Sequence, residues 1–454
     1  MYSKAELDAW DKEYFWHPFT QMKVYEAEDN LLIERGEGSY LIDIAGNRYL
    51  DGVSSIWLTV HGYNHAHISN AVKAQLDKIA HSTTLGQGSV PAAVLAKKLV
   101  EVAPPGLSKV FFSDDGATSV EVALKIAYQY WCQKDADNRD KYKFISLQEG
   151  YHGDTIGSVS VGGVESFHSL FKPYMFPGYK APVPYCYRCP LGEDRETCGL
   201  RCAREVEGIL ALYHHEIAAL IMEPGMICAG GMIDVPAGYL SYVRQLCDKY
   251  DILLILDEVA VGFGRTGTMF ACEQEGVAPD ILCLSKGITG GYMPLAATLV
   301  REKIYQAFWG EESKKFTHGH SYTGNQLACA AAIANLEVFE QEDVLAALQP
   351  KIDLLRQGLE EFKALEHVGD VRQRGFLVGI ELVKDKSTRE PFPPEFQLGH
   401  KVILAARRHG VILRPILDVI EIVPHLSVSE TELQKILTAA KRAIEEITQG
   451  QGSI

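Results

Sequence analysis

Two ionisable residues follow apolar runs that have the length of buried strands. Asp257 ends the run Ile252 to Leu256, and Lys286 comes two residues after the run Ile281 to Leu284. An ammonium is costly to bury, so such a lysine either reaches water along its own stem or loses its charge in a Schiff base with an aldehyde. Such an aspartate either caps a turn or keeps an adjacent pyridine nitrogen protonated. Together the two residues indicate a pyridine-ring aldehyde as the cofactor.

Two further segments could complete such a site. Ser113 to Thr118 precedes a helical pattern that runs from Ala117 to about Trp131. Free N–H groups at a helix N-terminus bind phosphate, and a glycine lets the phosphate approach the backbone. Many helices begin in this way, so the motif alone is weak. Tyr151, followed by His-Gly, either stacks on a ring or belongs to the core.

All of these candidates come where predicted strands end. The segments that we interpret as strands are Lys143–Leu147 and the apolar runs Val110–Phe112, Ala218–Met222, Ile252–Leu256 and Ile281–Leu284. Continuous apolar runs of this length are typical of parallel strands that helices cover on both faces. Ligands bind such sheets outside the carboxyl ends of the strands. The sequence therefore predicts an α/β fold with one active site in the central part of the chain.

The pattern changes after about Ala328. A helix from about Gln326 to Phe339 leads into amphipathic helices and short strands, among them Leu377–Leu382 and Val419–Val423. Short strands near the N-terminus, Ser39–Ile42 and Asn47–Leu50, are expected to pack with this smaller α+β domain. We therefore predict residues 1–60 as the N-terminal part of the small domain, 61–335 as the large cofactor-binding domain and 336–454 as the C-terminal small domain.

The composition argues against several classes of protein. Hydrophobic residues make up 47% of the 454 residues and charged residues 23%, which suits a large buried core. A net charge of −15 without a basic stripe argues against nucleic-acid binding. The N-terminal segment is polar, unlike a secretory signal, and the apolar runs are too short for a membrane span. Ten cysteines are too few for a disulfide scaffold, so a reducing cytoplasm is the expected compartment.

Four of the cysteines form two closely spaced pairs, Cys186 with Cys189 and Cys198 with Cys202. This spacing is that of two knuckles of a four-thiolate zinc site. The alternative is four reduced thiols in a surface loop. A catalytic metal is not expected, because four thiolates leave no open coordination position. The sequence leaves a structural zinc and free thiols as equal alternatives.

Longer motifs resemble the class III aminotransferases, which use pyridoxal 5′-phosphate (PLP). The segment from Asp257 to Gly267, followed by Pro279-Asp280 and Ser285-Lys286-Gly287, resembles the signature of that class. His318 to Asn325 and Gly369 to Leu382 resemble two further segments of it, and the likeness covers nearly the whole chain. The resemblance implies the aspartate-aminotransferase fold, PLP fold type I. In that fold a large domain with a mostly parallel sheet joins a split small α+β domain.

The resemblance also implies a role for each matching residue. Lys286 would hold the cofactor and move a proton, Asp257 would pair with the ring nitrogen and Tyr151 would stack on the ring. The phosphate would be held by the backbone of Gly116 and Ala117 and by Ser321 of a partner subunit, which implies a homodimer with composite sites. The substrate would meet the remaining matching residues, Trp57, Arg265, Gly319 and Arg414, with Arg414 on a carboxylate.

Within the class, several elements resemble the branch that aminates 8-amino-7-oxononanoate in biotin synthesis. They are Trp16 to Met22, Asp51 to Trp57, His61 to His65, Gly150 to Thr155 and Leu413-Arg414-Pro415. The amino donor that this implies is S-adenosylmethionine or lysine. Three positions depart from the pattern, and the first of them leaves the donor open: Phe19 in place of Tyr, Ile227 near an expected Gln, and Asp115 in place of Ser.

Two other functions compete with this interpretation. One is another ω-amino-acid aminotransferase of the same class, which would need a shorter site for substrates such as β-alanine. The other is a non-catalytic, zinc-stapled binding protein on the same fold. The intact pair of Lys286 and Asp257 argues against the binding protein.

Overall fold

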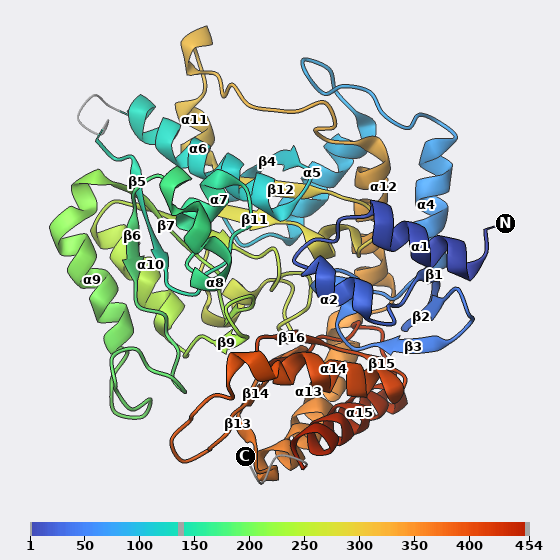
Figure 1. Cartoon of the computed structure of the whole chain (residues 1–454). Helices are drawn as coiled ribbons and strands as arrows, with labels where there is room; N and C mark the ends of the chain where they lie inside the picture. The colour runs from blue at the N-terminus through green and yellow to red at the C-terminus, as the bar shows by residue number, and fades with distance from the viewer. Residues whose placement is uncertain (1, 135–139, 450–454) are drawn as a thin grey trace.

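The computed structural model describes residues 2–134 and 140–449. Within these ranges the large domain is built on a seven-stranded sheet (Figure 1). Its strand order is β4 (Leu107–Ser113), β12 (Ala296–Arg301), β11 (Ile281–Leu284), β10 (Leu253–Asp257), β7 (Ile217–Met222), β5 (Lys143–Leu147) and β6 (Tyr179–Ala181). β12 pairs antiparallel with both of its neighbours, and the other pairs are parallel. The mostly parallel sheet expected from the apolar runs is confirmed.

Alternate side chains of the central strands enter hydrophobic clusters on opposite faces of the sheet. In β10, Leu254 and Leu256 pack in one cluster and Ile255 in the other. This is why the runs are apolar at every position rather than at every second one. Helix α6 (Gly116–Lys134) covers one face, and α9 (Arg201–Tyr213) and α10 (Tyr239–Lys249) lie against the other. The sequence placed the start of α6 one residue late and its end three residues early.

The small domain contains an antiparallel sheet in the order β13 (Val368–Arg374), β14 (Leu377–Leu382), β17 (Val419–Ile422) and β16 (Arg414–Ile416). Helices α13 (Val344–Leu359), α14 (Leu398–Arg408) and α15 (Glu430–Thr448) pack around it. Helix α15 is amphipathic and buries its apolar face in the core. The side chain of Ser429 caps its first turn.

The N-terminal strands join the C-terminal part of the chain, as expected. Strands β1 (Ile33–Glu37), β2 (Tyr40–Asp43) and β3 (Arg48–Asp51) form a sheet that β15 (Val411–Ile412) completes. β3 and β15 are parallel neighbours. This pairing supports the split small domain, whereas the boundaries at residues 60 and 335 stay a prediction.

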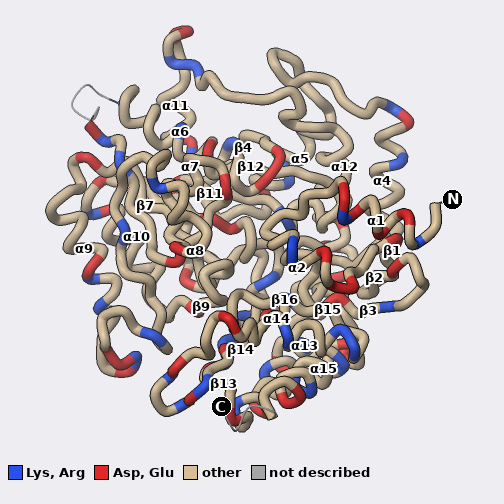
Figure 2. Tube along the Cα trace, in the orientation of Figure 1, with Lys and Arg blue, Asp and Glu red and all other residues tan. Residues whose placement is uncertain are grey.

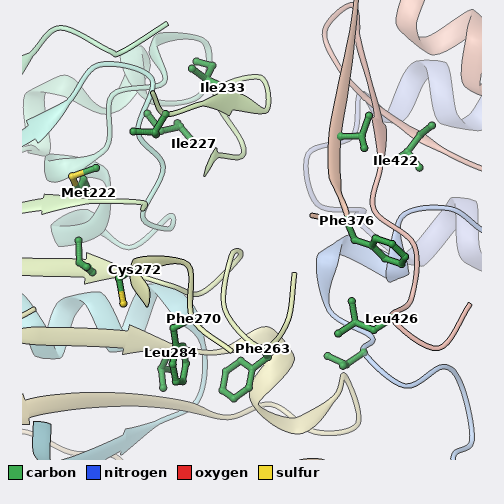
Figure 3. Close-up of a cluster of buried hydrophobic side chains, with 14 of the residues drawn as sticks. Met222, Ile227, Ile233, Phe263, Phe270, Cys272, Leu284, Phe376, Ile422 and Leu426 are labelled. Carbon is green, nitrogen blue, oxygen red and sulfur yellow. The ribbon is translucent and has the colours of Figure 1, made fainter. Parts of the chain in front are cut away.

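The two domains share a hydrophobic cluster. Phe263 and Phe270 of the large domain belong to the same cluster as Phe376, Ile422 and Leu426 of the small domain, and Figure 3 shows the two groups facing each other. Because protein interiors are closely packed, this shared core fixes the relative position of the two domains.

The remaining elements connect these layers or lie at the surface. Among the described residues, no helix is both long enough and apolar enough to cross a membrane. Basic and acidic residues are interspersed along the outer helices (Figure 2). The other helices and strands are α1 (Lys4–Tyr14), α2 (Met22–Ala27), α3 (Ser54–Trp57), α4 (Ala66–Leu76), α5 (Val90–Val102), α7 (Ile156–Val161), α8 (Glu165–His168), β8 (Met226–Ile227), β9 (Ile233–Asp234), α11 (Glu302–Ala307) and α12 (Gln326–Gln341).

Candidate active site

A cavity of about 810 Å³ lies at the carboxyl ends of the central strands and is closed on one side by the small domain. Side chains and backbone from segments far apart in the sequence meet in its wall. The structure brings together seven of the residues expected from the sequence: Trp57, Gly116, Ala117, Tyr151, Asp257, Lys286 and Arg414.

Lys286 enters the cavity from the turn after β11. Its backbone is left-handed, with φ of 46°, which is uncommon for a residue with a side chain. Its Nζ lies 4.6 Å from the centre of the Trp57 ring. Burial lowers the pKa of the Lys286 amine below its usual value. A lowered pKa favours the unprotonated amine, which is the form that attacks an aldehyde.

Asp257 ends β10, next to the strand that leads to Lys286. Its Oδ2 accepts a hydrogen bond from His152 Nδ1 at 2.7 Å, and its Oδ1 accepts one from the Val259 N–H at 3.1 Å. Both side chains of the His152–Asp257 pair are buried. The sequence singled out the Tyr-His-Gly segment but gave His152 no role, because only the fold brings it to Asp257.

The N-terminus of α6 forms another part of the wall. The N–H groups of Gly116 and Ala117 belong to the first turn and therefore have no partner within the helix. A side chain on Gly116 would come within 2.7 Å of Val259, and one on Gly153 within 2.4 Å of Ala117. Neither position has room for a side chain, and Gly116, Ala117 and Gly153 all line the cavity, so backbone is exposed there as a phosphate site requires.

Asp115 has the ordinary role of a helix cap. Its Oδ1 accepts the Thr118 N–H at 2.9 Å, and its carbonyl accepts the Ser119 N–H at 3.0 Å. Asp115, which stands where the family pattern has Ser, therefore serves here as the cap of α6. A carboxylate committed to Thr118 still leaves the N–H groups of Gly116 and Ala117 available.

Tyr151 is held at both its backbone and its ring. Its hydroxyl donates to Asp154 Oδ2 at 2.7 Å, and its N–H donates to Glu223 Oε2 at 3.1 Å. Glu223 also accepts the Cys228 N–H at 3.0 Å, and burial raises the pKa of Glu223 to about 7. The sequence placed Glu223 at a strand end but missed it as a site residue.

Trp57 lies on a backbone segment with unusual torsion angles. Ser54, Ser55 and Trp57 all have positive φ values, of 51°, 65° and 59°. Such conformations are costly and persist only where the surroundings impose them. The Trp57 indole N–H donates to Glu421 Oε2 at 2.7 Å. Glu421 is a second residue of this region that the sequence did not indicate.

Arg265, expected in the substrate site, does not line the cavity. Its guanidinium is buried and donates to the carbonyls of Pro424 and Thr59, each at 2.7 Å, and to Ser54 Oγ at 3.3 Å. Ser54 and Thr59 flank Trp57 in the sequence, and Pro424 follows β17. In this chain Arg265 therefore ties the segment around Trp57 to the end of β17, and it is not among the residues that line the cavity.

Ser321 and Gly319 also lie outside the cavity of their own chain. Both are exposed, and the Ser321 carbonyl accepts a hydrogen bond from His81 Nε2 at 2.7 Å. Their expected contact with a partner subunit stays a prediction.

The four clustered cysteines surround a small space of about 30 Å³. All four thiols are free, and burial raises the pKa of Cys202 to about 11. Among the described residues, no three or more His, Cys, Asp or Glu side chains are arranged to hold a metal ion. The structure thus brings the two pairs together without forming a metal centre.

Comparison with known proteins agrees with this arrangement. The model of the family described as aminotransferase class-III matches residues 23–444. The chain is 55% identical over 444 residues to the adenosylmethionine-8-amino-7-oxononanoate aminotransferase of Aquifex aeolicus, covering 97% of each. The crystal structure of the Methanocaldococcus jannaschii adenosylmethionine-8-amino-7-oxononanoate aminotransferase matches with a TM-score of 0.93 at 51% identity, over 98% of this chain and 99% of that one. A PLP-bound amine transaminase from an uncultivated Pseudomonas species matches with a TM-score of 0.90 at 38% identity, over 96% and 99%.

Proposed function

The chain belongs to the class III aminotransferases, and on that basis we propose that it aminates 8-amino-7-oxononanoate to 7,8-diaminononanoate, a step of biotin synthesis. It is a PLP-dependent enzyme of PLP fold type I. Its substrates are a small-molecule amino donor and a keto acceptor. The observation that carries the proposal is one cavity holding Lys286, Asp257 and Arg414 together.

The residues of the cavity fit PLP at three places. The first-turn N–H groups of Gly116 and Ala117 suit the phosphate, because both residues line the cavity and Gly116 has no side chain to cover its backbone. The buried carboxylate of Asp257 suits the ring nitrogen. The Lys286 amine suits the aldehyde.

When bound, PLP supplies an electron-withdrawing ring that lets a proton leave the carbon bearing the amino group. Lys286 provides the amine that attaches the cofactor and the base that takes and returns this proton at Nζ. Asp257, oriented by His152, would keep a proton on the ring nitrogen. Tyr151 and Trp57 line the cavity with aromatic rings, which suit the faces of a pyridine ring.

Arg414 is the residue we assign to the carboxylate of the keto acceptor. It lines the cavity, is half-buried and has no ion-pair partner within the described part of the chain. A guanidinium offers two parallel N–H groups to a carboxylate, which gives both affinity and orientation. Arg414 comes from the small domain and Lys286 from a strand end of the large domain, so a substrate that carries both a ketone and a carboxylate could meet both residues in this cavity.

The amino donor is the open part of this proposal. Phe19 lines the cavity and packs edge-on against Phe167, with ring centres 5.3 Å apart. Because Phe19 has no hydroxyl, the donor loses a polar contact that a tyrosine would offer. We propose S-adenosylmethionine or lysine as the donor.

A donor screen tests this function directly. Protein supplied with PLP is incubated with 8-amino-7-oxononanoate and either S-adenosylmethionine or lysine, and diaminononanoate is measured by mass spectrometry. Formation with one donor supports the proposal. No diaminononanoate with either donor, together with rapid amination of a short keto acid, favours another ω-amino-acid aminotransferase. No amino transfer at all favours a binding protein.

We further propose a homodimer with composite sites. Residues 81–85 contact residues 320–325. The Thr84 hydroxyl donates a hydrogen bond to the Thr323 carbonyl at 2.9 Å. Large apolar side chains on or near them are exposed, namely Leu85, Val90 and Tyr322. A second copy of the chain would cover these side chains and bring Ser321 and Gly319 to its neighbour's cavity.

Two further assignments stay proposals. A reducing cytoplasm suits the ten cysteines, which are all free and all lie among the described residues. A structural zinc on Cys186, Cys189, Cys198 and Cys202 would require their side chains to turn inward, since Zn–S bonds are about 2.3 Å long. The shared cavity between the two pairs is the observation that supports it.

A further inference from the structure

A buried carboxylic acid lies directly behind the wall of the active site. Glu421, on β17, is fully buried. Its Oε2 accepts the Trp57 indole N–H at 2.7 Å, and its Oε1 has no hydrogen-bond partner among the described residues. A buried carboxylate with one unsatisfied oxygen is costly. Such a group is expected where its charge has a use.

Glu421 and Lys286 contact the same indole from different sides. The acid accepts the N–H at the edge of the Trp57 ring, while the Lys286 Nζ lies over the ring, 4.6 Å from its centre. A cation over an indole face is attracted by the ring. A charged acceptor at the N–H also fixes the orientation of the ring. The three side chains therefore form one connected group.

Glu421 also faces Arg414 across the hairpin. The two residues are direct partners in the antiparallel pairing of β16 and β17, so their side chains project from the same face. The partner of Glu421 on the other side, in β14, is Gly379, which carries no charge. The charged groups near Glu421 are thus the cations Arg414 and Lys286, and the neighbouring buried thiol is Cys228.

These surroundings place the ionisation of Glu421 in the neutral range. Burial raises its pKa to about 7, while Arg414, the Trp57 N–H and Lys286 favour the ionised form. The acid is therefore charged above neutral pH and neutral below it.

We propose that Glu421 is a positioning residue of the amino-transfer site, which holds the Trp57 ring against Lys286 and supplies the negative charge that balances Lys286 and Arg414. This inference rests on the proposed function. It assigns Glu421 two measurable effects. The charge stabilises a positive nitrogen on Lys286, and it weakens the hold of Arg414 on a substrate carboxylate.

The first test is a pH titration of the holoenzyme, followed by the visible absorbance of the lysine-bound cofactor. Glu421→Gln keeps an oxygen for the Trp57 N–H and removes the charge. The midpoint of the titration should fall by about one pH unit. Glu395→Gln, at an exposed position, removes the same charge and should leave the midpoint unchanged.

The second test compares two ketones of equal chain length, one ending in a carboxylate and the other in a methyl group. In Glu421→Gln the KM of the carboxylated ketone should fall by about threefold or more, because a like charge near the carboxylate has gone. The KM of the neutral ketone should stay unchanged. A merely structural role would move both values together.

Trp57→Phe provides a second variant if Glu421→Gln does not hold the cofactor. It keeps the acid but removes the N–H that favours ionisation, so a smaller shift in the same direction is expected. An unchanged midpoint and an unchanged KM ratio in the variants would overturn the inference while leaving the proposed function intact. Absence of the visible band from the unsubstituted protein supplied with PLP would overturn both.

Discussion

Replacing Arg414 with alanine should weaken the keto acceptor far more than the amino donor. The guanidinium lines the cavity and makes no ion pair within residues 2–134 and 140–449, where Glu421 on the paired strand is its neighbouring acid, so it is available to the acceptor carboxylate. Truncating one partner of a buried charge pair costs about 2–5 kcal/mol. Because Arg414 is only half-buried, solvent screening places the cost near about 2–3 kcal/mol. That is a loss of about 30- to 160-fold in affinity.

The two half-reactions can be measured separately by single-turnover spectroscopy of the cofactor. With S-adenosylmethionine the donor half-reaction should change little, because the donor carboxylate lies next to the carbon that bears the amino group, whereas the acceptor carboxylate lies at the far end of its chain. A ketone without a carboxylate serves as the matched substrate and should lose nothing. Arg442→Ala, at an exposed position, is the control for loss of a positive charge. Equal losses in both half-reactions would refute the assignment of Arg414.

Four other predictions follow from the same structure. Lys286→Ala should abolish amino transfer while the circular dichroism spectrum stays that of the folded protein, and near-normal turnover would contradict the role of Lys286. Arg265→Ala should lower the free energy of unfolding by about 3 kcal/mol, because it leaves buried acceptors unpaired; unchanged stability with a raised KM would instead mean that Arg265 binds substrate. The protein should sediment as a dimer, and a fully active monomer in analytical ultracentrifugation would contradict the composite site. Elemental analysis of protein purified without chelator should find one zinc per chain. A zinc content well under one per chain, with all four clustered thiols titratable, would mean that these thiols are free.

The sequence predicted the part of the site that depends on strand ends. Asp257 and Lys286 follow apolar runs, and parallel strands bring their carboxyl ends to one edge of a sheet, so their meeting needs no further information. Gly116 could be predicted in the same way. A helix that starts directly after a strand directs its first N–H groups toward the same edge of the sheet. The boundaries of the elements were less accurate because the ends of β4 and α6 depend on local hydrogen bonds.

The contacts between distant segments could not be predicted in this way. His152 meets Asp257, and Glu421 meets Trp57, only because the whole fold brings the segments together. Arg265 belongs to a motif that resembles a substrate site, yet the carbonyls of Thr59 and Pro424 decide where its guanidinium lies. Nothing in the spacing of the motif specifies those carbonyls.

The parallel pairing of β3 with β15 has a consequence for how the protein is made. About 360 residues separate the paired positions in the two strands. At the usual rate of translation, synthesis of that stretch takes roughly 20–70 s. During this time the edge of β3 has no partner on the ribosome, although the large domain can already fold. The nascent chain therefore presents an open strand edge for most of its synthesis, and until residue 411 emerges this edge can pair with other chains.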